Sequence, residues 1–186
     1  MTTPLHIRRA GREDAAEIGR IHVDAVRRAY SGIYTPEYLA GLSADERAAR
    51  WTEEGKGHLA RTDTTFAVFV AFSDGRLVGF ADIGPVEEPA ASDCAELFAI
   101  YLDPAYIGKG VGQALFHTCV EHAKAHGFKS MTARVLSRNF RARAFYERMQ
   151  GEPMPATEKL IRTGGSTERV ISYRWPALPA SSFPTE

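Results

Sequence analysis

Three glycines at alternate positions, Gly108, Gly110 and Gly112, precede an apolar stretch in the segment PAYIGKGVGQALF (104–116). Glycine allows left-handed turns and lets a ligand approach the backbone without meeting a Cβ. The first N–H groups of a helix have no intrahelical partners, and the helix dipole adds positive potential there. Lys109 adds a charge. This spacing therefore indicates a turn that holds a phosphate or a diphosphate where a helix begins.

Two better-known phosphate-binding patterns do not fit this turn. The P-loop sequence G-x-x-x-x-G-K-[ST] is absent, and Gln113 stands where the dinucleotide fingerprint requires a final Gly or Ala. The next expected strand also lacks a terminal acidic residue that could hold a ribose. One alternative remains open, which is that the glycines only make a tight turn between a strand and a helix.

The elements that must position the turn follow from hydrophobic periodicity and from turn residues. The sequence predicts helices from Gly11 through Ala29, from Ser43, from the glycine turn to His126, and over 139–149. It predicts strands over 4–10, 66–72, 77–85, 95–104, 129–136 and 158–175, the last being a hairpin around Gly164 and Gly165. This order indicates a mixed α/β domain with one central sheet.

Overall composition narrows the class of protein. The chain has 186 residues, 44% of them hydrophobic and 25% charged, which is typical of a soluble globular domain. A formal net charge of +0 argues against a nucleic-acid partner. No apolar run is long enough to span a membrane, and the N-terminus has no signal-peptide core. Cys94 and Cys119 lie in apolar stretches, so we expect free thiols and a cytoplasmic protein.

Two motifs together resemble the GNAT superfamily, the GCN5-related N-acetyltransferases. The segment LDPAYIGKGVGQALF is similar to the family pattern Q/R-x-x-G-x-G/A, with Ile107 in place of the usual Arg or Gln. The segment NFRARAFYERMQG is similar to N-x-x-A-x-x-F-Y-E-x-x-G, with Gly151 one residue late. The resemblance implies a GNAT fold, with a mixed, mostly antiparallel sheet of six to seven strands and about four helices. It implies one acyl-CoA N-acyltransferase domain over 4–176, and we expect a disordered tail over 177–186.

The resemblance implies acetyl-CoA as cofactor, bound where the strand 95–102 and the following strand splay apart. The pantetheine arm would pair with the backbone of that strand, and the diphosphate would lie on the glycine turn. Arg138, Arg141 and Arg143 could contact the 3′-phosphate, or they could form a solvated basic face. The cofactor-binding residues that we expect are Ile100, Tyr101, Leu102, Ile107, Gly108, Lys109, Gly110, Val111, Gly112, Gln113, Asn139, Arg141 and Phe145.

Direct acyl transfer to an amine needs a base for the amine and an acid for the departing thiolate. By resemblance, Tyr146 is the expected acid, and Asn139 seven residues earlier lies on the same helix face. The alternative is that Tyr146 only packs in the core. By resemblance, Glu96 is the expected base, because some family members carry a catalytic glutamate on this strand, and an otherwise apolar strand would desolvate its carboxylate. It could instead face water at a strand end, and many family members use a water chain.

The sequence indicates little about the acceptor substrate. By resemblance, Tyr30 and Tyr34, with Tyr38 and Trp51, could line a pocket for a small-molecule or peptide amine, or they could simply pack between helices. The resemblance also implies that a homodimer is common. His122 and His126 have metal-ligand spacing without an obvious third ligand, so we expect no metal. Two rival functions stay open, namely an acyl-CoA-binding regulatory domain and a nucleotide-binding module.

Overall fold

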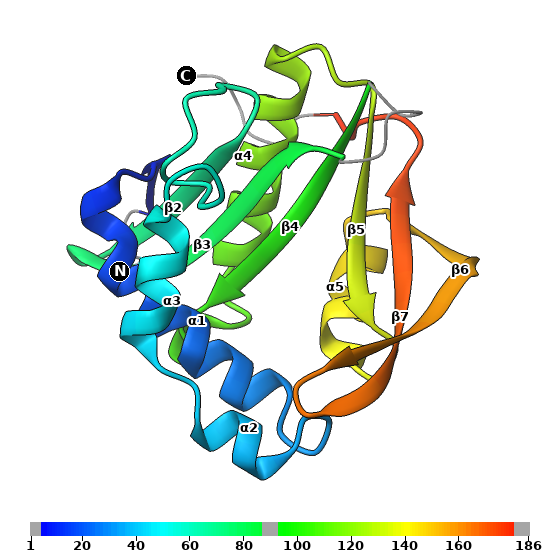
Figure 1. Cartoon of the computed structure of the whole chain (residues 1–186). Coiled ribbons are helices and arrows are strands. Elements are labelled where there is room, and N and C mark those ends of the chain that lie inside the picture. Colours follow the sequence, from blue (N-terminus) through cyan, green and yellow to red (C-terminus); the bar gives the residue numbers. More distant parts are fainter. Residues whose placement is uncertain (1–4, 87–92, 181–186) are drawn as a thin grey trace.

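The computed structural model describes residues 5–86 and 93–180, in which seven strands form one mixed sheet (Figure 1). The strand order is β1-β2-β3-β4-β5-β7-β6. Every neighbouring pair is antiparallel except β4 and β5, which are parallel. The strands are β1 (His6–Arg9), β2 (Ala67–Ser73), β3 (Arg76–Pro85), β4 (Cys94–Leu102), β5 (Ser130–Leu136), β6 (Glu152–Thr163) and β7 (Ser166–Trp175). The mixed, mostly antiparallel sheet that the sequence predicts is confirmed.

Helices cover both faces of the sheet, as Figure 1 shows with α1 to α3 in front and α4 and α5 behind. On the front, Ile18 and Ile21 of α1 are fully buried against Phe80 of β3. On the back, α4 presents Leu115 and Phe116 to the larger core cluster. The helices are α1 (Ala15–Ala29), α2 (Pro36–Ala40), α3 (Ala44–Thr52), α4 (Val111–Ala125) and α5 (Phe140–Arg148). No helix in the described ranges is both long enough and apolar enough to cross a membrane.

Local capping chemistry sets several helix ends. Ser43 accepts a hydrogen bond from Glu46 N (3.3 Å) and caps α3, as the sequence predicts. Gly127 follows α4 with φ of +81°, the left-handed conformation expected at a glycine C-terminal cap. Along α1, the apolar residues Ala15, Ile18, Ile21 and Ala25 are buried, whereas Ala29 is exposed because the chain there turns into the loop that precedes α2.

Two predicted boundaries differ from the structure. The strand β6 begins at Glu152 rather than at 158, and its register with β7 shifts between Met154 and Lys159. Proline cannot donate to a ladder, but Pro153 is tolerated because β6 is the edge strand of the sheet. The predicted disordered tail does not begin at 177, since Leu178 packs on the core and its N–H bonds Lys129 O (3.1 Å). Residues 181–186 of that tail lie outside the described residues.

The sheet opens in its middle, between the two parallel strands. The ladder between β4 and β5 ends at the pair Leu97 and Ala133. Beyond it β4 stays paired with β3 as far as Leu102, while β5 stays paired with β7, so the two strands diverge (Figure 1). The register between β3 and β4 shifts at this point, which leaves Phe98 as an extra residue in β4. The predicted splaying of these strands is confirmed.

Candidate active site

The glycine turn at the end of the opening has a backbone that requires glycine. Gly108 and Gly110 have φ of +82° and +83°, and a Cβ on either would meet no atom within 4 Å. Conformation rather than crowding therefore selects these two glycines, and the space above them is open. Gly112 differs, because a Cβ there would contact Leu102 (3.4 Å) and Phe145 (3.5 Å) where α4 meets α5.

The N-terminus of α4 directs backbone donors toward this turn. The first hydrogen bond of the helix runs from Ala114 N to Gly110 O (3.0 Å). The N–H groups of Val111, Gly112 and Gln113 precede that bond and are the unpaired donors of the first turn. The positive end of the helix dipole lies at the same place. The turn and helix can thus bind an anion through main-chain groups alone.

Charged side chains around the turn are few. Lys109 lies over the ring of Tyr106, with Nζ 4.9 Å from the ring centroid, and the side chain of Ile107 is exposed. Of the three arginines near α5, Arg143 donates to Tyr173 Oη (3.2 Å), and Arg138 donates to Gly32 O (2.7 Å). Arg141 is exposed, and it is the one of these three that makes no hydrogen bond or ion pair with the residues that the structure describes.

The open edge of β4 carries the three residues predicted to pair with pantetheine. From Phe98 to Leu102 this edge faces β5 without a strand partner in the described chain. Ile100 and Leu102 pack on the core behind the sheet, while Tyr101 faces the front and stacks on His22. An extended ligand could therefore add to this edge with main-chain hydrogen bonds.

Tyrosines from three segments converge beside the opening. Tyr146 of α5 is buried, and this burial, reinforced by Tyr30, raises the pKa of its hydroxyl. Burial also raises the pKa of Tyr101 well above its ordinary value, with further contributions from Tyr30, Tyr146 and Tyr34. The rings of Tyr30 and Tyr34 lie 4.6 Å apart. The structure thus brings the predicted acid and both predicted pocket tyrosines into one cluster.

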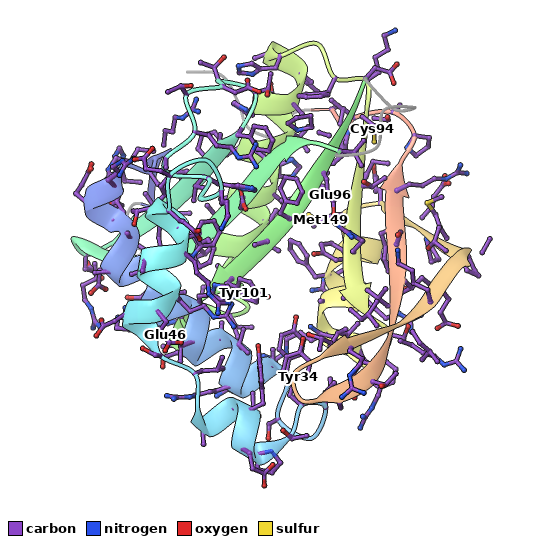
Figure 2. The ribbon with its side chains drawn as sticks, viewed as in Figure 1. Tyr34, Glu46, Cys94, Glu96, Tyr101 and Met149 are labelled. Atoms are coloured by element: carbon purple, nitrogen blue, oxygen red, sulfur yellow. The ribbon has the colours of Figure 1, made fainter. Side chains whose placement is uncertain are left out.

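The segment 30–35, here named the tyrosine loop, is fixed from two sides. The Tyr34 hydroxyl lies 3.2 Å from Thr163 Oγ1, and Thr35 N donates to Gly164 O (2.9 Å). A Cβ at Gly164 would overlap the Tyr34 ring, so the β6–β7 turn must have glycine there. Figure 2 shows Tyr101 at the lower end of β4 and Tyr34 beside that turn. The tyrosine loop and the β6–β7 hairpin therefore border the opening together.

Two residues predicted to bind the cofactor have structural contacts. Asn139 is buried, and its Oδ1 accepts a hydrogen bond from Ala142 N (3.2 Å), which caps α5. Phe145 packs edge-on against Phe116 of α4, with ring centroids 6.2 Å apart. These contacts fix α5 and so the position of Tyr146. A contact of either residue with a cofactor stays a prediction.

Glu96, the predicted base, is buried on the front of the sheet and is 5% exposed. Arg134 of β5 donates through Nε to Glu96 Oε1 (2.7 Å), so an ion pair bridges the two parallel strands just before they separate. Figure 2 places Glu96 on β4 on the side of β5. The predicted burial is what the structure has, but one carboxylate oxygen is already occupied.

The sequence reasoning missed a second polar cluster on the front of the sheet. His58 Nδ1 lies 2.7 Å and 2.8 Å from the two oxygens of Asp82, which is buried in β3. The pair borders a cavity of about 240 Å³ between α1, α3 and β3. A carboxylate in the apolar strand LVGFADIGP was the available signal. The cavity is lined by His22, Arg47, Arg50, Trp51, Lys56, Gly57, His58 and Asp82.

The two histidines with metal-ligand spacing have ordinary contacts. His122 Nε2 lies 3.0 Å from Thr65 O, and His126 Nδ1 lies 2.9 Å from His122 O. Across residues 5–86 and 93–180, no three side chains of His, Cys, Asp or Glu are grouped so that they could hold a metal ion.

Known proteins resemble this chain in sequence and in fold. A sequence model of the family described as "Acetyltransferase (GNAT) family" matches residues 12–151. The uncharacterized N-acetyltransferase YuaI of Bacillus subtilis is 30% identical over 175 residues, which cover 94% of each chain. A spermidine N(1)-acetyltransferase of Thermoplasma acidophilum is 24% identical over 144 residues, covering 76% of this chain and 84% of the relative.

A solved structure shares the architecture. The PaiA N-acetyltransferase of Thermoplasma acidophilum, crystallised in complex with coenzyme A, superposes with a TM-score of 0.67 at 21% identity. The match covers 92% of this chain and 99% of that one.

Proposed function

Because the chain belongs to the acetyltransferase (GNAT) family, we propose that it transfers an acetyl group from acetyl-CoA directly to the primary amine of a small molecule or peptide. The observation that carries this proposal is the separation of β4 from β5 beyond Leu97, next to the glycine turn. An unpaired strand edge and an anion-binding helix start, side by side, suit a ligand with an extended amide arm and a diphosphate.

The residues present fit coenzyme A. The open space above Gly108 and Gly110 leaves room for phosphate oxygens, and the N–H groups of Val111, Gly112 and Gln113 would hold them. Backbone groups of Ile100, Tyr101 and Leu102 would pair with the pantetheine arm. When bound, acetyl-CoA supplies an activated acetyl thioester. A backbone N–H near Ile100 would polarise its carbonyl group, an oxyanion-hole role.

Tyr146 is the proposed acid for the departing thiolate. Burial raises the pKa of its hydroxyl, so the proton stays on the oxygen at neutral pH and can be donated. The hydroxyl makes no hydrogen bond to another group of the described residues, which leaves it free to act on a ligand. Glu96 is the base that the sequence indicates, although Arg134 engages one of its oxygens.

The acceptor amine would enter at the tyrosine loop. Tyr30 and Tyr34 pack together beside the β6–β7 hairpin, and they provide aromatic walls with polar tips. A sequence relative acts on spermidine, according to its name, which supports an amine acceptor for this chain as well. We expect the identity of the acceptor to be decided by this loop and by the β6–β7 hairpin.

Turnover measurements test the proposal. Acetyl-CoA is mixed with spermidine, L-lysine, O-phosphoethanolamine or a free N-terminal tripeptide, and thiol release is compared with acetylated product by mass spectrometry. We expect equal amounts of thiol and N-acetyl product with at least one amine. Binding of coenzyme A without acetylation of any amine would contradict catalysis and leave a binding domain.

That second candidate, an acyl-CoA-binding regulatory domain of low activity, rests on Ile107. This exposed residue replaces the family's usual Arg or Gln and cannot donate a hydrogen bond to a diphosphate. Calorimetry with coenzyme A, ATP and NAD separates both candidates from a nucleotide-binding module, because only the first two predict selective binding of coenzyme A.

We also propose that the enzyme works in the cytoplasm. Its two cysteines, Cys94 and Cys119, are free and buried, which suits a reducing compartment. Burial raises the pKa of the Cys119 thiol, so this group stays protonated and unreactive. Fractionation of cells that produce the protein would test this location.

A further inference from the structure

The carboxylate of Asp82 is buried on the face of the sheet that carries α1 and α3. It is 3% exposed, and its neighbours on β3 are apolar. Burying a carboxylate is strongly unfavourable unless the charge is paired. Burial raises the pKa of Asp82, while His58 and Arg61 oppose that rise. A group kept in such a costly position calls for a role in function.

The geometry of the pair resembles that of a catalytic base with its supporting acid. Nδ1 of His58 faces both oxygens of Asp82, at 2.7 Å and 2.8 Å. A neutral imidazole has one N–H, which here must point to the carboxylate, so Nε2 keeps its lone pair. A carboxylate on Nδ1 both orients the ring and stabilises the imidazolium formed when Nε2 takes a proton.

The pair lies against the place where the sheet opens. Asp82 is the cross-strand partner of Ala99, directly after the extra residue Phe98. The ring of Phe98 contacts the His58 ring edge-on, with centroids 5.1 Å apart. His22, in the same cavity, stacks on Tyr101. The cavity thus adjoins the stretch of β4 that has lost its parallel partner.

We propose that the reacting amine of an acceptor that enters at the tyrosine loop reaches this cavity and that His58 is its catalytic base, with Asp82 as the positioning residue; the inference rests on the proposed acetyl transfer. The ammonium proton moves to His58 Nε2, and the freed lone pair forms the C–N bond as the C–S bond breaks. A second amine proton reaches the leaving sulfur by way of Tyr146. His58 then returns its proton to water, so one proton is released per acetyl group.

The charges that face the pair favour this direction of proton transfer. The nearby cations disfavour a bound ammonium and a His58 imidazolium alike, whereas Asp82 contacts His58 and stabilises the charge that arrives on that ring. Burial and the charges of Arg47 and Arg50 lower the pKa of His22 to about 4, so His22 adds no charge at neutral pH. The charged and titratable groups that face the pair are His22 of α1, Arg47 and Arg50 of α3, Lys56 and Arg61 of the following loop, and Cys119 of α4 across the sheet.

His58 is better placed than Glu96 for this role. One oxygen of Glu96 is already engaged, because Oε1 accepts a hydrogen bond from Arg134 that links β4 to β5. His58 has one nitrogen fixed and the other unengaged by any described residue. In this scheme Glu96 therefore stabilises the contact between two strands, and His58 is the general base.

Kinetics with three variants test the inference. The probe is the panel amine that the wild-type protein acetylates fastest, with acetyl-CoA, across pH 5–9 in steps of about half a unit. We expect His58→Ala to lower kcat/KM by about 10²–10⁴-fold, to lose the acidic limb of the pH profile, and to recover part of its rate with added imidazole. Asp82→Asn should move the limb to lower pH, because the imidazolium loses its counter-charge.

His126→Ala, a change at a histidine past the end of α4 whose Nδ1 lies 2.9 Å from His122 O, serves as the matched control and should leave the acidic limb in place. Calorimetry must show that each variant binds coenzyme A as the wild type does, which excludes misfolding. If the His58→Ala variant does not fold, the isosteric Asp82→Asn variant still tests the inference through its pH profile. An unchanged profile in folded His58 and Asp82 variants of an active enzyme overturns this inference while the proposed function stands.

A spectroscopic readout needs no turnover. In ¹⁵N spectra of the free protein at high pH, the His58 ring should carry its proton on Nδ1, and Asp82→Asn should change the signal of that nitrogen. A proton on Nε2 overturns the role of His58 as base. Absence of acetyl transfer by the wild type to every panel amine is a different result, and it would overturn the proposed function itself.

Discussion

The imidazole of His22 stacks on the ring of Tyr101, with 4.8 Å between the ring centroids and 23° between the planes. The contact joins the middle of α1 to the unpaired end of β4. The Nδ1 atom of His22 is buried and has no hydrogen-bond partner among the described residues. A charged His22 would therefore sit in an apolar, cation-lined site, which is why its pKa falls to about 4.

This low pKa predicts acid sensitivity of the fold. The pKa of His22 is about 4 in the folded protein against 6.5 for an unperturbed histidine, so the unfolded chain binds the extra proton between these values. Stability should then decrease as pH falls from 6.5 toward 4, by at most about 1.4 kcal/mol per pH unit from this group. Urea unfolding of wild type and His22→Phe at several pH values checks the slope, which should be shallower in the variant. His6→Gln, on the exposed edge of β1, is the control, and equal slopes in all three proteins would contradict the prediction.

Tyr146→Phe should reduce turnover while leaving cofactor affinity almost unchanged. The variant keeps the ring that packs against Tyr173 and Trp175 and removes only the proton donor. Loss of a general acid lowers the rate by about 10²–10⁴-fold. Steady-state kinetics and calorimetry with coenzyme A measure the two quantities. Equal rates in wild type and variant would remove Tyr146 from the mechanism.

Tyr173→Phe provides a matched comparison for that experiment. Its hydroxyl donates to Glu147 (2.7 Å) and accepts from Arg143 (3.2 Å), so it is engaged in structural contacts beside Tyr146. We expect this variant to lose about 1 kcal/mol of stability per hydrogen bond, with little change in kcat. A large loss of kcat from Tyr173→Phe would show that the rate depends on packing around α5 rather than on one hydroxyl.

Gly110→Ala should weaken binding of coenzyme A. At φ of +83° an alanine costs about 1–2 kcal/mol, and either the turn relaxes or a Cβ enters the phosphate space. We expect the Kd for coenzyme A to rise by about tenfold or more, as measured by calorimetry. Gly127→Ala has the same strain, at φ of +81°, but lies past the other end of α4. It should lower the melting temperature to a similar extent without changing affinity, and equal affinity losses in both would argue against a phosphate site at the turn.

Ile107→Arg should tighten binding of coenzyme A by restoring the family's usual side chain. The position is exposed, with an extended backbone that any residue can adopt. A charge-assisted hydrogen bond contributes about 1.5–3 kcal/mol, which corresponds to about tenfold or more in Kd. Pantetheine lacks the diphosphate, so its affinity should not change. If the affinity for pantetheine rises equally, the effect of residue 107 does not come from a contact with the diphosphate.

Local chemistry made much of the fold predictable. Gly127 and Ser43 mark helix ends through conformational and hydrogen-bonding rules that act within a few residues. The start of β6 was not predictable in this way, because Pro153 and Pro155 disfavour a strand and only the edge position of β6 tolerates them. Its pairing with β7 is a property of the assembled sheet.

The candidate site likewise has one part that could be predicted from the sequence and one part that depends on the folded chain. The glycine turn and the Tyr146 motif are contiguous in sequence, so their types and spacing were visible there. His58 and Asp82 are 24 residues apart, and their contact arises only when the loop after α3 folds over β3. Asp82 was visible as a lone carboxylate in an apolar strand, but its partner could not be inferred from spacing.

The hydrogen bonds between the tyrosine loop and the β6–β7 hairpin join stretches near opposite ends of the chain. Arg138 adds a further tie to Gly32. The rim at which an amine would arrive is therefore assembled from parts remote from residues 104–116. Under the proposed function, substitutions in the hairpin would reshape that rim while the glycine turn stays as it is, so selectivity for new amines would evolve without changing the proposed site of the acyl donor.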